Sequence, residues 1–376
     1  MALRIEAVRD SRLLKEFVSL PYGLHKEHTL WVPPLKKDEK FLLSPKHPFW
    51  KNAKRQFFLA YDTKRPIGRI AAFVDENYNN YARVKCGAFG FFECDNNFPA
   101  AHALLEAAWE WLDEQEMDFM RGPLNPSTNY TCGMLVDGFA QPPALMMPWN
   151  PPWYPAFMET WFLHKEEDLF AYTIKRDGLV LPDWLRRELA AIKAEKRFTW
   201  RSSSKATMKE DVQAMLRIYR ESWADNWGFT PLSAEEAKLL VKELGAILDP
   251  EFFILFFFQG KPAAGMVALP NLNPLLARLK GSIGPLLPWH YLRARKQIHQ
   301  GYRIMLFGIL PQYRMAGLPM LLLDEMLNLA RKRPELEWVE GSWVLESNEA
   351  IDDLIEDFGG ILTKRYRIYR KNIKPC

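Results

Sequence analysis

Two stretches of this 376-residue chain follow the same pattern about half a chain apart, and this internal repeat constrains the fold more than any other feature. Phe57 to Val74 reads "FFLAYDTKRPIGRIAAFV" and Phe253 to Leu269 reads "FILFFFQGKPAAGMVAL". In each stretch an aromatic-rich run leads into a polar turn, a basic residue with proline, and a second apolar run containing glycine. That pattern is typical of a β-hairpin. A repeat at this separation predicts a duplicated domain.

The same order of elements follows each hairpin. The first continues with "CGAFGFFEC", a predicted strand, and then a helix that opens at Pro99. The second leads to an apolar run ending at Leu310 and a helix that opens near Pro319. Proline suits the first turn of a helix, because the N–H that it lacks has no partner there. The sequence therefore predicts two α/β domains, residues 1–175 and 201–376, joined by a charged linker at 176–200.

The charge distribution singles out one region of the chain. A net charge of +4 is too small to indicate nucleic-acid binding by itself. From Phe252 to Leu323, however, there is no Asp or Glu. Such a region is either a solvated face or one shaped to hold an anion. The basic residues in it are Lys261, Arg278, Lys280, Arg293, Arg295, Lys296, Arg303 and Arg314.

The joint between the last strand of this region and its helix has the composition of a phosphate site. Backbone N–H groups at a helix start carry partial positive charge and suit a pyrophosphate. Gly317 permits close approach of a ligand, and Arg314 adds a fixed positive fork. The joint of the first half, "ECDNNFP" from Glu93 to Pro99, has neither residue type and carries two carboxylates, which oppose a phosphate. We therefore expect one such site, in the second half.

The joint and the order of elements together resemble the GNAT acyltransferase superfamily. The acyl-CoA-binding turn of that family follows the pattern Arg/Gln-x-x-Gly-x-Gly/Ala, and here it reads "RMAGLP" from Arg314, with Pro319 in place of the last Gly/Ala. Through "RGPLNPSTN", "PWNPPWYP" and "SWADNWGFTPL" the whole chain is similar to the YghO-like group of bacterial tandem GNAT proteins. The resemblance implies two tandem GNAT-like domains with mixed sheets flanked by helices.

The resemblance also implies a function. The group includes ceramide-synthase-type relatives, so the implied activity is acyl-CoA-dependent N-acyl transfer to a hydrophobic amine such as a sphingoid base. Three alternatives stay open: acetyl transfer to a small amine or peptide, aminoacyl transfer from tRNA, and a non-catalytic CoA-binding module. No interleaving of aromatic and basic residues typical of an RNA module is visible, so we expect no nucleic-acid partner. The scattered histidines predict no metal site.

Acyl-CoA is expected as the co-substrate of the second half. A backbone N–H between Phe307 and Leu310 can stabilise the oxyanion of the reacting thioester. The resemblance implies a binding set for acyl-CoA that surrounds the joint and the start of the late helix. Its members are Phe307, Ile309, Arg314, Met315, Ala316, Gly317, Leu318 and Asn348.

Two residues are candidates for proton transfer. Glu346 can accept the proton of the amine, directly or through a water, or it can simply cap the late helix. Many family members carry a tyrosine in that helix as the acid for the thiolate, but the matching position here is Ile355. Tyr302 is the tyrosine that we take as its replacement, with Tyr313, Tyr366 or water as alternatives.

The first half is expected to supply either contacts with the acceptor or a lid, and one basic segment of the second half bears on how the substrate is reached. Polar residues beside strand ends and Pro-rich turns either bind the acceptor or satisfy turn backbone. The segment from Asn273 to Gln297 mixes Leu, Ile and Trp with five basic residues, so it either rests on an anionic membrane or is a solvated loop. Few cysteines and a charged start predict a cytoplasmic location, with peripheral binding to the inner membrane. The four candidates for acceptor binding are Glu93, Asn125, Asn129 and Tyr154.

Overall fold

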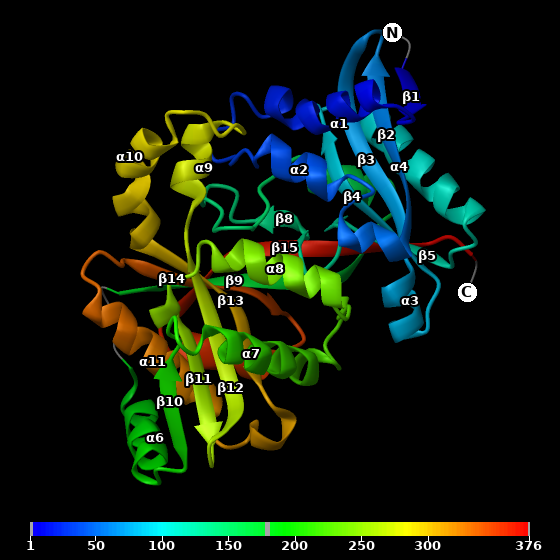
Figure 1. The fold of residues 1–376 in the computed structure, drawn as a ribbon. Coiled ribbons are helices and arrows are strands. Elements are labelled where there is room, and N and C mark those ends of the chain that lie inside the picture. The colour runs from blue at the N-terminus through cyan, green and yellow to red at the C-terminus, as the bar shows by residue number, and fades with distance from the viewer. Residues whose placement is uncertain (1–2, 177–180, 375–376) are drawn as a thin grey trace.

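The computed structural model describes residues 3–176 and 181–374, and their strands form a thirteen-stranded mixed sheet flanked by helices (Figure 1). This architecture confirms the predicted α/β class. Both predicted hairpins form: Phe58 lies opposite Ile70 in the first, and Ile254 lies opposite Met266 in the second. The repeat in the sequence is therefore a repeat in the structure.

The first half contributes nine strands and five helices of the part that the structure describes. The strands are β1 (Leu3–Ala7), β2 (Ala53–Asp62), β3 (Arg65–Asp75), β4 (Cys86–Cys94), β5 (Phe119–Gly122), β6 (Leu124–Asn125), β7 (Thr131–Cys132), β8 (Met134–Asp137) and β9 (His164–Lys175). The helices are α1 (Ser11–Leu24), α2 (Lys36–Leu42), α3 (Glu76–Ala82), α4 (Phe98–Glu114) and α5 (Tyr154–Thr160).

The rest of the described chain repeats this order with fewer strands and more helices. The strands are β10 (Phe198–Ser202), β11 (Phe253–Phe258), β12 (Lys261–Pro270), β13 (Gly301–Ile309), β14 (Trp338–Leu345) and β15 (Gly360–Asn372). The helices are α6 (Asp183–Ala194), α7 (Met208–Trp223), α8 (Ala234–Gly245), α9 (Asn273–Leu279), α10 (Leu287–Gln300), α11 (Leu318–Lys332) and α12 (Glu349–Asp357).

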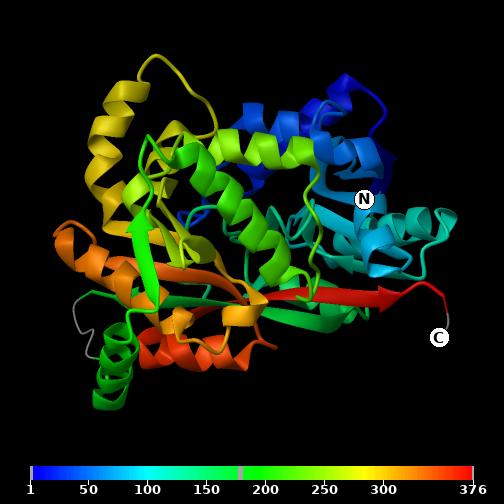
Figure 2. The ribbon, with the colours of Figure 1, turned by 60° about the horizontal axis from the view of Figure 1, so that its bottom comes forward.

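The two halves exchange their last strands. The sheet order is β1-β2-β3-β4-β5-β15-β9-β14-β13-β12-β11-β10, so each terminal strand lies beside the other half. β15 pairs with β5 through Tyr369 and Gly122, and β9 pairs with β14 through Lys175 and Trp338. Figure 2 shows β15, in red, running from the second half across to the first. Continuous backbone hydrogen bonding therefore joins the halves into one sheet.

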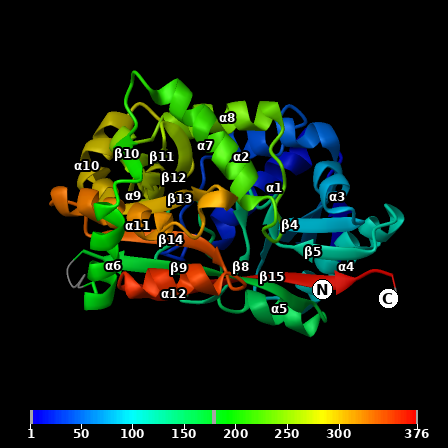
Figure 3. The same ribbon diagram turned by 90° about the horizontal axis from the view of Figure 1, so that it is seen from below.

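Helices cover both faces of the second half of the sheet. α6, α11 and α12 pack on one face, where Leu185, Leu322 and Phe358 share a core with the inward side of the strands. α7 and α8 lie on the other face, where Met215 and Ile218 of α7 pack on Phe253 (Figure 3). The predicted boundaries 1–175, 176–200 and 201–376 stay a prediction. Residues 183–194 within the expected linker form α6.

The strand exchange predicts that neither half is stable alone. Residues 1–180 and 181–376, produced as separate chains, would each expose a long unpaired edge, at β5 or β14, and such edges favour aggregation. We expect no cooperative thermal unfolding from either piece, and recovery of one transition when the two are mixed and refolded, measured by circular dichroism. If 181–376 alone unfolds cooperatively as a monomer, β15 must pair with β14 inside one half, and the exchange is not required.

Candidate active site

The parallel pair β13–β14 separates halfway along its length. The two strands pair from Gly301 with Trp338 as far as Ile304 with Gly341, and no further. Each remains in the sheet through its other neighbour, because β12 follows β13 to Ile309 and β9 follows β14 to Leu345. The strands therefore open into a V, along which β13 and β14 no longer pair with each other.

A β-bulge marks the point where the V begins. Val267 of β12 lies opposite Leu306, but the next residue, Ala268, lies opposite Ile304, so Met305 is left outside the ladder. The extra residue of a bulge is unpaired, and its backbone groups are free to contact a ligand. The amide of Met305 is therefore available at the apex of the opening.

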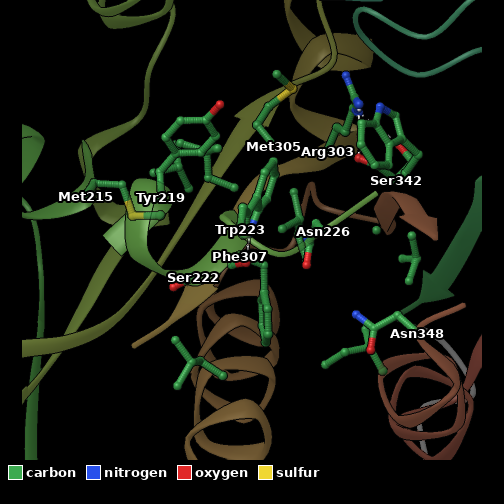
Figure 4. A pocket seen from close by; sticks show the side chains of 18 of the residues that line it. Met215, Tyr219, Ser222, Trp223, Asn226, Arg303, Met305, Phe307, Ser342 and Asn348 are labelled. Atoms are coloured by element: carbon green, nitrogen blue, oxygen red, sulfur yellow. Dashed lines mark hydrogen bonds between the residues drawn. The ribbon is translucent and has the colours of Figure 1, made fainter. Parts of the chain in front are cut away.

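A cavity of about 940 Å³ occupies this opening. Both edges of the V line it, together with α7, α8 and the starts of α11 and α12. Figure 4 shows part of it, with Met215 and Tyr219 from α7 on one side and Asn348 at the start of α12 on the other. The loop of the first half from Thr128 to Tyr130 also contributes, so both halves build the wall.

One arm of the cavity is apolar. It runs between α7, α8 and the sheet. The volume of the whole cavity lies at the upper end of the range of small-molecule sites. Such a surface gains free energy by burying hydrocarbon. The residues of α7, α8 and their flanks that line this arm are Met208, Val212, Met215, Leu216, Leu240, Val241, Leu244 and Leu248.

The turn before α11 forms a polar end of the cavity, opposite in character to the apolar arm. Gly317 is the N-cap of α11 with φ of +75°, a left-handed conformation, and a Cβ built there would lie 2.5 Å from Ile192 of α6. Glycine is thus required for backbone and for packing. The amides of Gly317 and Leu318 have no acceptor among residues 3–176 and 181–374. Pro319 has no N–H, so it removes one donor from this helix start.

Six of the eight residues expected to bind acyl-CoA line this cavity, namely Phe307, Ile309, Arg314, Met315, Gly317 and Asn348. Arg314 donates from Nη2 to the carbonyl of Ser222, 3.0 Å away, which fixes its guanidinium between α7 and the turn. The carbonyl of Phe307 accepts from Trp223 Nε1 at 3.1 Å. Ala316 and Leu318 do not line the cavity, although the amide of Leu318 belongs to the same turn. Their roles in binding stay a prediction.

Glu346 lies beside the cavity rather than in it. Its neighbours Leu345 and Ser347 line the wall, but its own carboxylate is held elsewhere. One oxygen accepts from the amide of Asp168 at 3.0 Å, and the other pairs with Lys165 Nζ at 2.6 Å. Both partners belong to β9, so Glu346 ties β14 to the exchanged strand of the first half.

Tyr302 lies at the other end of β13 from the V. Its ring is buried and stacks on Phe252, with ring centroids 4.2 Å apart. Its hydroxyl donates to Asp249 at 3.2 Å, and burial raises its pKa above the ordinary value. Tyr302 does not line the cavity, so we carry no catalytic role for it forward.

All four acceptor candidates belong to the first half, and three of them lie around the end of β4. Glu93 accepts from His25 Nε2 at 2.6 Å and from the hydroxyl of Tyr154 at 3.0 Å. Burial pushes the pKa of Glu93 up, but His25, Arg69 and Tyr154 together hold that pKa below its ordinary value. Asn125 accepts from the amide of Phe91. These three residues are hydrogen-bonded to one another or to the backbone, and none of them lines the cavity.

The corresponding opening of the first half is filled by its own chain. β4 and β5 pair in parallel only from Cys86 to Ala88, and beyond that β6 runs against β4. A Cβ built on Gly90 would lie 1.6 Å from the carbonyl oxygen of Leu124. No room is left there for a ligand between the strands. That acyl-CoA binds only in the second half stays a prediction.

Asn129 is the one acceptor candidate that lines the cavity of the second half. Its Oδ1 accepts from the hydroxyl of Tyr219, and its Nδ2 donates to the carbonyl of Thr230 at 2.8 Å. A first-half side chain is therefore bonded to α7 and to the loop after it. Asn129 positions the walls of the cavity, and its contact with an acceptor stays a prediction.

Two residues of this site did not emerge from the sequence. Asp225 follows α7 and is the one carboxylate among the described residues that line the cavity. Arg303 lines it as well, and only 5% of its surface is exposed. Asp225 belongs to "SWADNWGFTPL", which carries the family resemblance, and Arg303 belongs to the acid-free region. Both segments were noted in the sequence, but the sequence does not indicate which of their side chains point into a cavity.

Comparisons with known proteins bear on the whole chain. No family model matches it. Protein YghO of Escherichia coli K12 is 30% identical over 365 residues, which cover 96% of this chain and 93% of that protein. A bacterial ceramide synthase of Caulobacter vibrioides is 30% identical over 381 residues, which cover 98% of this chain and 97% of that protein.

Solved structures agree on the fold. A tandem GNAT protein from the clavulanic acid biosynthesis pathway matches over 100% of both chains, with a TM-score of 0.56 and 11% identity. A GCN5-related N-acetyltransferase from Sphaerobacter thermophilus matches over 99% of this chain and 96% of its own, with a TM-score of 0.53 and 13% identity.

Proposed function

The chain belongs to the YghO-like group of tandem proteins in the GNAT acyltransferase superfamily, and from this we propose that it transfers a long acyl chain from acyl-CoA to the nitrogen of a hydrophobic amine such as a sphingoid base. The observation that carries the proposal is the cavity of about 940 Å³ at the β13–β14 opening, with its apolar arm. An acetyl group needs no such arm. The relative named as a ceramide synthase supports the same class of acceptor.

The turn before α11 suits the pyrophosphate of CoA. Free amides at Gly317 and Leu318 stand at the positive end of α11, and anions bind well at such helix starts. Arg314 lines the same turn and no carboxylate of the described chain bonds it. The donor would then extend along the V toward the bulge at Met305. Its thioester carbonyl would reach the unpaired amide there, which suits a developing oxyanion.

The apolar arm between α7 and α8 suits a long chain. Each methylene buried contributes about 0.8 kcal/mol, so a chain longer than acetyl by a dozen carbons gains several kcal/mol even after ordering costs. The arm is reached from the apex of the V, because Met305, Leu306 and Met215 line one continuous cavity. We propose that it holds the hydrocarbon of the donor or the acceptor.

Asp225 is the carboxylate best placed to receive the proton of the amine. An ammonium group must lose a proton before it attacks a thioester, and a carboxylate within reach can accept it directly or through water. Asp225 lines the cavity, whereas Glu346 is bonded to Lys165 and to the amide of Asp168. We therefore propose Asp225 as the base and Glu346 as a tie between β14 and β9.

The donor site is tested by Arg314→Glu. Replacing the fork with a carboxylate places a negative charge at the phosphate turn, so we expect free CoA and palmitoyl-CoA to lose the thermal stabilisation that they give the original protein. The matched control is Lys261→Glu, the same charge change on an exposed hairpin residue. Equal stabilisation of the Arg314 variant and the control would contradict a CoA site at this turn.

The two carboxylates are distinguished by Asp225→Asn and Glu346→Gln. We expect Asp225→Asn to lower turnover by about 10²–10⁴-fold with acyl-CoA binding kept. Glu346→Gln should instead lower the free energy of unfolding by about 1 kcal/mol, because it weakens the bond to Lys165 while activity per folded molecule is kept. A large loss of turnover in the Glu346 variant alone would restore that residue as the base.

A membrane surface would supply both hydrophobic substrates. α9, α10 and their connection stand at the edge of the molecule, in yellow in Figure 1, and expose Ile283, Leu286, Trp289 and Leu292. The five basic residues of this segment are exposed around them, and residues 273–300 contain no acid. Apolar side chains among basic ones suit an anionic bilayer. None of the described helices is long and apolar enough to cross one.

Charge reversal on α10 tests this surface. We expect Arg293→Glu, Arg295→Glu and Lys296→Glu together to reduce sedimentation of the protein with phosphatidylglycerol vesicles, and salt to weaken the binding of the original protein. The control changes Lys15, Lys54 and Lys64, three exposed lysines elsewhere, to Glu. If both triple variants bind the vesicles equally, α10 is not the membrane surface.

A further inference from the structure

Arg303 is a buried cation whose direct partners are all neutral. Its Nε donates to Ser342 Oγ at 2.9 Å and its Nη2 to the carbonyl of Ser342 at 3.0 Å. Its Nη1 donates to the carbonyl of Leu145 at 2.8 Å. Figure 4 shows Arg303 and Ser342 side by side at the cavity. No carboxylate among the described residues bonds this guanidinium.

The charges behind Arg303 do not balance it. Glu340 is the carboxylate whose charge Arg303 feels, but its oxygens are taken by Lys364 Nζ at 2.7 Å and Ser342 Oγ at 2.8 Å. All three charged residues are at most 5% exposed. Two cations and one anion leave this buried group with a net charge of +1. Burial lowers the pKa of Arg303, as expected for a cation that lacks its own counter-ion.

The guanidinium also keeps unused donors. An arginine has five N–H groups, one on Nε and two on each Nη. Each of the three nitrogens here donates through one N–H, so the second N–H on each Nη has no acceptor among the described residues. Two donors on neighbouring nitrogens match the two oxygens of a carboxylate or the oxygens of a phosphate. Buried charges in proteins are normally paired, so the missing partner belongs to a ligand in the cavity.

The position of Arg303 assigns this partner to the acceptor rather than to CoA. Its neighbours Tyr302 and Ile304 pack on the face of the sheet that α11 covers. Side chains alternate along a strand, so Arg303 points to the opposite face, toward Leu145 and the helices α7 and α8. The phosphate turn lies beyond Ile309, after the far end of β13, whereas Arg303 lies where β13 and β14 still pair.

We propose that Arg303 binds an anionic oxygen group, of the carboxylate, sulfonate or phosphate class, on the acceptor close to its amine. The inference rests on the proposed function, because it takes the cavity to be the acceptor site of an acyltransferase. Asp225 and Arg303 line the same cavity, and the proposal assigns the ammonium group of a zwitterionic acceptor to Asp225 and its anionic group to Arg303. The site would then select amphiphilic amino acids over plain long-chain amines. This narrows the hydrophobic amine of the proposed function to one that carries an anionic group, which replaces the sphingoid base given there as the example.

The test compares three acceptors of equal chain length with palmitoyl-CoA: 2-aminohexadecanoic acid, 2-aminohexadecan-1-ol and hexadecylamine. Hydrogen bonds to charged groups suggest a preference of about 10-fold or more in kcat/KM for the amino acid. Arg303→Met should bring that ratio to about one. The Lys364–Glu340 pair stays neutral in this variant, and Arg303→Lys provides a second variant that keeps the charge but loses the fork.

Two results would overturn the proposal. The original protein could prefer the amino alcohol or the plain amine, or Arg303→Met could lower kcat for all three acceptors by the same factor, which would indicate a role at the thioester or in folding. A binding measurement distinguishes failure of this proposal from failure of the proposed function. Without any turnover, 2-aminohexadecanoic acid should raise the melting temperature of the original protein and not that of Arg303→Met, while CoA should stabilise both equally.

Discussion

The ladder between β9 and β15 is the interaction on which the rest of the structure depends. These two strands, the last of each half, pair antiparallel from Gly360 opposite Ile174 to Arg370 opposite His164. On its other edge β9 holds β14 as far as Leu345. Because β14 keeps this partner on one edge, it remains in the sheet where it separates from β13 beyond Gly341. The opening at the site is therefore stabilised from the other half of the chain.

The two halves share the same architecture, but the opening between their parallel strands is filled in one half and forms a cavity in the other. In the first half, Asn125 and the carbonyl of Leu124 sit against β4, and glycine at position 90 is what lets the chain come so close. In the second half a cavity occupies the V, and Gly317 brings the turn of α11 against α6. One half is thereby a filled support and the other an open site. The first half still reaches that site through Asn129 and its loop.

Local elements could be predicted from the sequence, whereas their long-range pairing could not. The hairpins follow from turn chemistry, which acts within a few residues of each repeat. The turn before α11 could be located because arginine, glycine and proline stand within a few residues of one another, and its binding of phosphate stays a prediction. The strand exchange depends on pairing between residues nearly 200 positions apart, for which a single sequence carries no signal. Asp225 escaped prediction for a related reason, because its place depends on where α7 ends above β13.

The central claim is that the second half moves a long acyl chain from CoA to an amine, and one competition experiment tests it most directly. Purified protein is given one hydrophobic amine with an equimolar mixture of acetyl-, octanoyl-, dodecanoyl- and palmitoyl-CoA, and the amides formed are measured by mass spectrometry. The apolar arm predicts that the long-chain amides dominate the earliest products. Predominant acetylation, or release of free CoA with no amide at any chain length, would contradict the account, although the GNAT fold would stand.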